Sequence, residues 1–173
     1  MSRKSIFCSL ILVYILIYTT YNLRVALSME NVSKVIDDFD IPKLIIVGVG
    51  LFANVVVFLI LVNLSWFFTS IGLTYNRGEK LADHQGIKKL DYYIIYFSIY
   101  SLHFAILIFL ALFNWGDIIN NFASTLKMMN VIVVIITFLT LIVYMYRCKV
   151  LTKISFVSIL ILNIINIGYS ILS

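Results

Sequence analysis

Long uncharged stretches alternate with shorter polar ones along this chain, and the longest of them, 44–76, contains no Asp, Glu, Lys or Arg. A helix of about 20 apolar residues crosses a hydrocarbon core roughly 30 Å thick, so this stretch can span a bilayer and continue past one face. Four further uncharged stretches are of spanning length. The pattern predicts transmembrane helices over 5–23, 44–70, 92–115, 128–146 and 154–172.

The first uncharged stretch follows Arg3 and Lys4, as the apolar region of a signal peptide would. Residues 5–23 are about as long as a full span, whereas that region of a signal peptide usually has about 7–15 residues. Arg24 also precedes the small residues at 26–28 that could be cleaved. We therefore expect a retained first helix.

The polar segments between the predicted helices differ in kind. Within 25–41, apolar residues at steps of four, three, four and three form one helix face opposite charged residues. This pattern predicts a short amphipathic helix lying in the membrane interface. We expect 77–91, the most charged segment, to be a loop, 117–127 to be a milder loop that contains Asn, and 147–153 to be a tight basic turn.

Composition supports a membrane protein. Of the 173 residues, 62% are apolar and 12% charged, with a mean hydropathy of +1.06, whereas a soluble domain is about 45–50% apolar and about 25% charged. No polar segment is long enough to fold alone. We expect an all-α integral membrane protein that forms a single domain, a bundle of five transmembrane helices surrounded by the lipid bilayer.

The distribution of positive charge predicts the orientation. If the helices alternate in direction, nine of the 13 Lys and Arg residues share a side with the N-terminus. The positive-inside rule makes that side cytoplasmic, so the N-terminus is inside, the C-terminus outside, and the amphipathic segment outside. Aromatic belts are expected at both interfaces, with Tyr92, Tyr93, Tyr144 and Tyr146 at the inner one and Tyr18, Tyr21, Trp115 and Tyr169 at the outer one.

Polar residues recur on one face of each of the last four predicted helices when successive residues are projected about 100° apart. In a bilayer such faces gather where helices meet, because each polar side chain needs a partner. The four stripes therefore predict a common interior. The candidates for interhelical hydrogen bonds or for lining a path are Asn54, Ser65, Tyr93, Tyr96, Tyr100, His103, Asn130, Thr137, Asn163 and Asn166.

Two interpretations of this interior are open. The stripes can hold the bundle together through close packing and interhelical hydrogen bonds, or they can line a hydrated cavity for a solute or ion. Packing is favoured, because the predicted spans contain no carboxylate and no Lys or Arg, which transporters and proton pathways usually carry. Without a carboxylate partner, His103 is expected to be an uncharged core residue.

No motif for catalysis, a cofactor or a metal is found, since HExxH, GxSxG and a phosphate-binding glycine loop are missing from the sequence. Gly48 and Gly50 lie inside a predicted span, where they would let another helix approach closely. Cys8 and Cys148 lack metal-type spacing and are expected to be free thiols. The basic residues lie at membrane edges, so nucleic acid is not an expected partner. We expect a protein that is not an enzyme and has no cofactor.

These observations favour a small multi-pass protein that acts by helix–helix binding, as an accessory subunit or an immunity-type protein of a membrane complex. Its partner would be another membrane protein or a second copy of itself. The alternative is a small transporter or channel subunit with a path lined by Tyr, His and Asn. Frequent Ile, Asn, Lys, Phe and Tyr are typical of AT-rich genomes, so the expected location is a bacterial plasma membrane, with an organelle membrane as the alternative.

Overall fold

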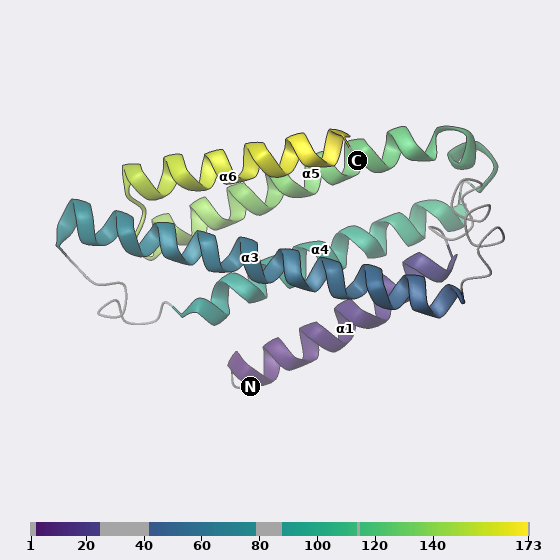
Figure 1. Cartoon of the computed structure of the whole chain (residues 1–173), viewed down its shortest axis with the longest axis horizontal. Coiled ribbons are helices and arrows are strands. Elements are labelled where there is room, and N and C mark those ends of the chain that lie inside the picture. The colour runs from purple at the N-terminus through teal and green to yellow at the C-terminus, as the bar shows by residue number, and fades with distance from the viewer. Residues whose placement is uncertain (1–2, 25–41, 79–87, 114, 173) are drawn as a thin grey trace.

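The computed structural model describes residues 3–24, 42–78, 88–113 and 115–172. In these ranges the chain forms helices and no strand, as predicted. Chain neighbours run in opposite directions through an elongated bundle (Figure 1). The five helices are α1 (Arg3–Arg24), α3 (Lys43–Arg77), α4 (Lys89–Phe113), α5 (Trp115–Arg147) and α6 (Lys153–Leu172).

The lengths of the helices fit a membrane. By length and composition, α1, α3, α4 and α5 can each cross a bilayer, and α6 is apolar over a shorter described stretch, Lys153–Gly168. At 1.5 Å per residue, the 35 residues of α3 extend roughly 52 Å, about 20 Å more than a hydrocarbon core. In a bilayer α3 must therefore tilt or project from one face.

The predicted loop over 117–127 is wrong, because α5 begins at Trp115 and continues through these residues. Polar residues mark where a helix leaves the hydrocarbon core, but they need not end the helix. An Asn or Asp residue within a helix costs only a few tenths of a kcal/mol.

Helix α3, by contrast, ends at a residue that stops helices. Gly78 has a φ of 67°, and its N–H donates to the Thr74 carbonyl at 3.1 Å. The predicted amphipathic segment 25–41 lies outside the described residues, as does 79–87 of the charged loop.

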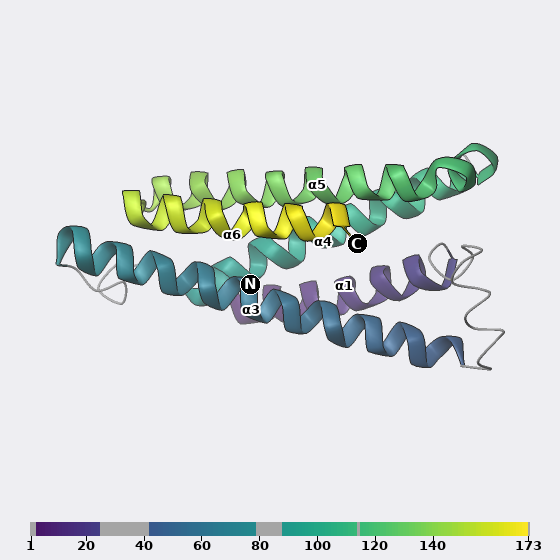
Figure 2. The same cartoon turned by 45° about the horizontal axis from the view of Figure 1, so that its top comes forward.

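The helices form a closed ring in the order α1, α4, α5, α6 and α3, with an additional contact between α3 and α4. Figures 1 and 2 both place α5 and α6 on one side of the bundle and α1 on the opposite side. Because neighbours are antiparallel, every helix has a Lys or Arg at the same end of the bundle, called the basic end below. These residues are Arg3, Arg77, Lys89, Arg147 and Lys153.

Two apolar clusters form the core. The first joins α3, α4, α5 and α6 and extends toward the basic end. The second is mostly aromatic and joins α1 to α3 and α4. Large apolar side chains on the outward faces of the helices are exposed, as lipid contact requires.

Three tyrosines expected in the aromatic belts do not face outward. Tyr18 and Tyr21 are only 5% exposed and Tyr92 is fully buried. Their rings pack against other aromatic rings inside the bundle, such as Tyr92 against Trp66 at a centroid distance of 5.5 Å. Tyr146 is 72% exposed, as a belt residue would be.

Candidate polar cavity inside the bundle

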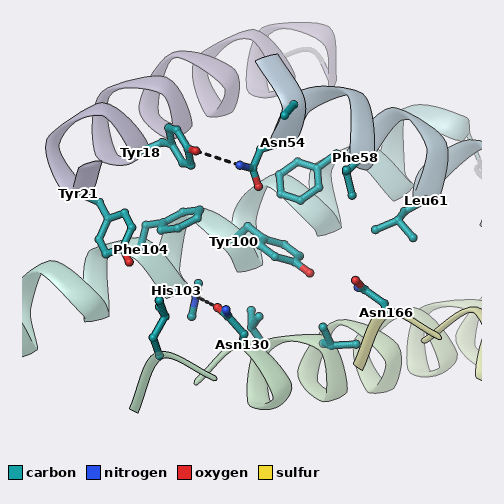
Figure 3. Close-up of a pocket in the computed structure, with 15 residues that line it drawn as sticks. Tyr18, Tyr21, Asn54, Phe58, Leu61, Tyr100, His103, Phe104, Asn130 and Asn166 are labelled. Carbon is teal, nitrogen blue, oxygen red and sulfur yellow. Dashed lines mark hydrogen bonds between the residues drawn. The ribbon is translucent and has the colours of Figure 1, made fainter. Parts of the chain in front are cut away.

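Polar and aromatic side chains from all five helices face a cavity of about 360 Å³ inside the bundle (Figure 3). The cavity lies in the half away from the basic end, since it includes residues near the C-terminus of α1 and in the N-terminal half of α3. Phe58, Leu61 and Phe104 supply part of its apolar lining. Its polar lining comprises Tyr18, Tyr21, Asn54, Tyr100, His103, Asn130 and Asn166.

The α1 side of the cavity is built from tyrosines on one helix face. Tyr14, Tyr18 and Tyr21 are spaced four and three residues apart, which places them above one another on α1. Phe104 of α4 packs against Tyr18 and Tyr21, with ring centroids 5.1 Å from each. Tyr14 is fully buried, and its hydroxyl has no hydrogen-bond partner among the described residues. The aromatic packing thus determines where the Tyr18 and Tyr21 hydroxyls lie.

Asn54 joins α3 to α1 at the cavity wall. Its Nδ2 donates to the Tyr18 hydroxyl and to the Gly50 carbonyl, each at 2.9 Å. A Cβ at position 50 would lie 2.8 Å from the Tyr18 hydroxyl, so glycine leaves room for this side chain. The predicted close approach of another helix is not seen at Gly48, where a Cβ would meet nothing within 4 Å, and at Gly50 the neighbour is the end of a side chain. Because both amide hydrogens of Asn54 are used, its side-chain oxygen is the atom left to accept a hydrogen bond from a molecule in the cavity.

The opposite wall carries two further polar pairs. His103 Nε2 and Asn130 Oδ1 lie 3.1 Å apart and connect α4 to α5. Because an amide oxygen only accepts, this pairing puts the imidazole proton on Nε2. The second pair is formed by the Tyr100 hydroxyl of α4 and the Asn166 side chain of α6, which point toward each other in Figure 3.

The lining therefore offers hydroxyl, amide and imidazole groups next to aromatic rings, with no carboxylate, Lys or Arg among the lining residues. Such groups exchange hydrogen bonds with an uncharged polar molecule but cannot neutralise an ion. No cluster of three or more His, Cys, Asp or Glu occurs in the described part of the chain. Cys8 and Cys148 are free thiols, as predicted.

Half of the predicted polar residues lie away from the cavity. The Ser65 and Tyr96 hydroxyls lie 3.5 Å apart and connect α3 to α4. Tyr93 accepts from Asn63 of α3 at 3.4 Å. Thr137 and Asn163 each donate to a carbonyl one turn earlier in their own helix, so these two bonds are not interhelical.

Asp91 connects three helices, although no sequence motif marks it as a contact residue. Its Oδ2 forms an ion pair with Arg3 of α1 at 3.1 Å and accepts from the Tyr144 hydroxyl of α5 at 2.8 Å. The same oxygen accepts the Lys88 backbone N–H at 3.0 Å, an N-terminal capping contact of α4. An acidic residue in the first turn of a helix was the available signal.

Comparisons of this chain with protein-family models, with characterised proteins and with solved structures found no match.

Proposed function

We propose that this is a multi-pass membrane protein whose five helices all cross the bilayer, and that it binds a small uncharged polar solute as a transporter or channel subunit. The basic end faces the cytoplasm, because every helix has a cation there. The N-terminus is then inside and the C-terminus outside. We propose no enzymatic activity for this protein. Its location in a bacterial plasma membrane stays a prediction from composition.

The observation that carries this proposal is the cavity itself. Side chains from α1, α3, α4, α5 and α6 converge on one space of about 360 Å³, which is within the range of small-molecule sites. Polar pairs that served only to hold helices together would be closely packed and would leave no such space between them.

The proposed site faces the outer half of the membrane. Toward the basic end, the bundle interior is filled by the first apolar cluster, whose buried members include Val62, Leu141, Met145 and Ile159. A solute would therefore enter from outside and meet a closed inner half. Binding of a membrane-protein partner through the outward helix faces stays a prediction, since lipid alone accounts for exposed apolar side chains there.

Cysteine accessibility tests the proposal. In a background with Cys8 and Cys148 replaced by Ser, Asn54→Cys and Asn166→Cys are exposed in turn to a membrane-impermeant thiosulfonate added from outside. We expect both to react, because both line the cavity. Ser65→Cys is the matched control, since Ser65 is fully buried and lies further along α3 toward the basic end.

Protection of Asn54→Cys and Asn166→Cys to the same degree as Ser65→Cys, in protein that elutes as a folded species, would exclude a water-accessible cavity. Equal reactivity of all three would indicate a loosened bundle and would also contradict the closed inner half.

A further inference from the structure

A second pocket, of about 610 Å³, lies at the basic end and is separate from the polar cavity. It is formed where the C-terminus of α3 meets the turn between α5 and α6, an arrangement visible at one end of the bundle in Figure 1. Its lining residues are Arg77, Tyr146, Arg147, Lys149 and Leu151.

Hydrogen bonds hold this pocket in shape. Arg77 Nη1 donates to the Lys149 carbonyl at 2.6 Å and so connects α3 to the turn. The turn closes through the Val150 N–H, which donates to the Met145 carbonyl at 3.0 Å, and Val150 and Met145 are both fully buried. The contact leaves four of the five guanidinium N–H donors of Arg77 for a ligand.

Among the residues that the structure describes, no acidic side chain compensates the charge of the pocket. Segment 147–153 carries three cations and no acidic residue. None of Arg77, Arg147 and Lys149 pairs with a carboxylate in the described part of the chain, where Asp91 is paired with Arg3 instead. Arg77, Arg147 and Lys149 are also exposed. The pocket is thus built for an anion.

An apolar strip leads away from the pocket along α5. Leu139, Val143 and Tyr146 are four and three residues apart, on one helix face, and are 54%, 51% and 72% exposed. A ligand with an anionic head at Arg147 and Lys149 could lay a hydrocarbon chain on this strip. A free phosphate has no hydrocarbon chain and would not contact this strip.

We propose that this pocket binds the headgroup of an anionic phospholipid, with Arg77, Arg147 and Lys149 on the phosphate and an acyl chain along the strip on α5. A guanidinium group can donate two parallel hydrogen bonds to the oxygens of one phosphate. Basic pockets between helices at the cytoplasmic face bind such headgroups. The site is independent of the polar cavity and uses the opposite end of the bundle.

The test is a lipid titration of the purified full chain in neutral detergent, with the melting temperature as readout. Phosphatidylglycerol should raise the melting temperature, whereas phosphatidylcholine and inorganic phosphate at the same concentration should not. In the variant Arg147→Gln/Lys149→Gln, the phosphatidylglycerol concentration for a half-maximal shift should rise about 25-fold, because each cation near an anionic headgroup is worth about fivefold in affinity.

The double variant Lys4→Gln/Lys43→Gln is the matched control, because it removes two exposed cations that do not line the pocket. It should titrate like the unmodified chain. If the double pocket variant does not fold, Arg147→Gln alone should show a rise of about fivefold. Equal shifts with phosphatidylcholine or with inorganic phosphate, a pocket variant that titrates normally, or an equal loss in the control would overturn the proposal.

Discussion

Gly72 determines how closely α3 and α6 approach each other. A Cβ at this position would collide with the Thr152 hydroxyl and lie 3.1 Å from the Ser155 backbone nitrogen. These atoms cannot easily move, because Thr152 caps α6 and its hydroxyl accepts the Ser155 N–H at 3.2 Å. Glycine is therefore required here by packing rather than by backbone conformation.

Gly72→Ala should lower the stability of the protein by roughly 1–3 kcal/mol, the usual cost of overpacking a core. Thermal unfolding in detergent measures the change. Gly48→Ala is the matched control on the same helix, because a Cβ there meets nothing within 4 Å, and it should be neutral or slightly stabilising. A Gly72→Ala protein as stable as Gly48→Ala would contradict the close helix contact.

Asp91 holds three elements, but its contacts should differ in strength. Tyr144→Phe removes a hydrogen bond to a charged group and should cost about 1.5–3 kcal/mol. Arg3→Gln should cost less than about 1 kcal/mol, because the Arg3 side chain is 46% exposed and water screens the pair. Asp91→Ala should cost more than either. Denaturation of the three variants gives the order, and a larger loss for Arg3→Gln than for Tyr144→Phe would refute it.

At the scale of the elements, the turn from α5 to α6 is closed by two backbone hydrogen bonds. The N–H groups of Val150 and Lys149 donate to the carbonyls of Met145 and Tyr146, both at 3.0 Å, which is the Schellman arrangement. Lys149 has a φ of 57°, a left-handed conformation that is costly for a residue with a side chain. The tight turn predicted over 147–153 is thus present.

Lys149→Gly should stabilise the protein by about 0.5–1 kcal/mol, because glycine adopts the left-handed conformation without steric cost. The melting temperature should be measured without anionic lipid, so that weaker lipid binding after loss of the Lys149 charge does not affect it. Lys149→Ala removes the same charge but keeps a Cβ, and should bring no such gain. Equal melting temperatures for the two variants would argue against the left-handed turn.

At the scale of the whole molecule, the orientation depends on α6. This helix has 20 residues, about the minimum for a crossing, and it packs against α3 and α5. Five crossings put the two termini on opposite sides of the membrane, whereas four crossings put them on the same side.

Tags at the two termini should therefore report different compartments. In intact cells, we expect an external protease to remove a C-terminal tag and to leave an N-terminal tag until the membrane is permeabilised. Equal protection of both tags would mean that α6 does not cross.

The sequence by itself determined the all-helical class, the five helices and their apolar character, because the length of an uncharged stretch and its Lys and Arg flanks are local properties. It also placed Asn54, Tyr100, His103, Asn130 and Asn166 on polar stripes. It could not locate the start of α5, since helix ends depend on capping and packing as well as on polarity.

Only the tertiary structure decided which polar residues meet. It turned Tyr18 of α1 into the cavity, and it left Thr137 and Asn163 bonded within their own helices. It also gathered Arg3, Asp91 and Tyr144 from three helices. The physical reason is that a helix apolar on nearly every side can rotate about its axis at little cost in burial, so side-chain fit with its neighbours selects the rotation.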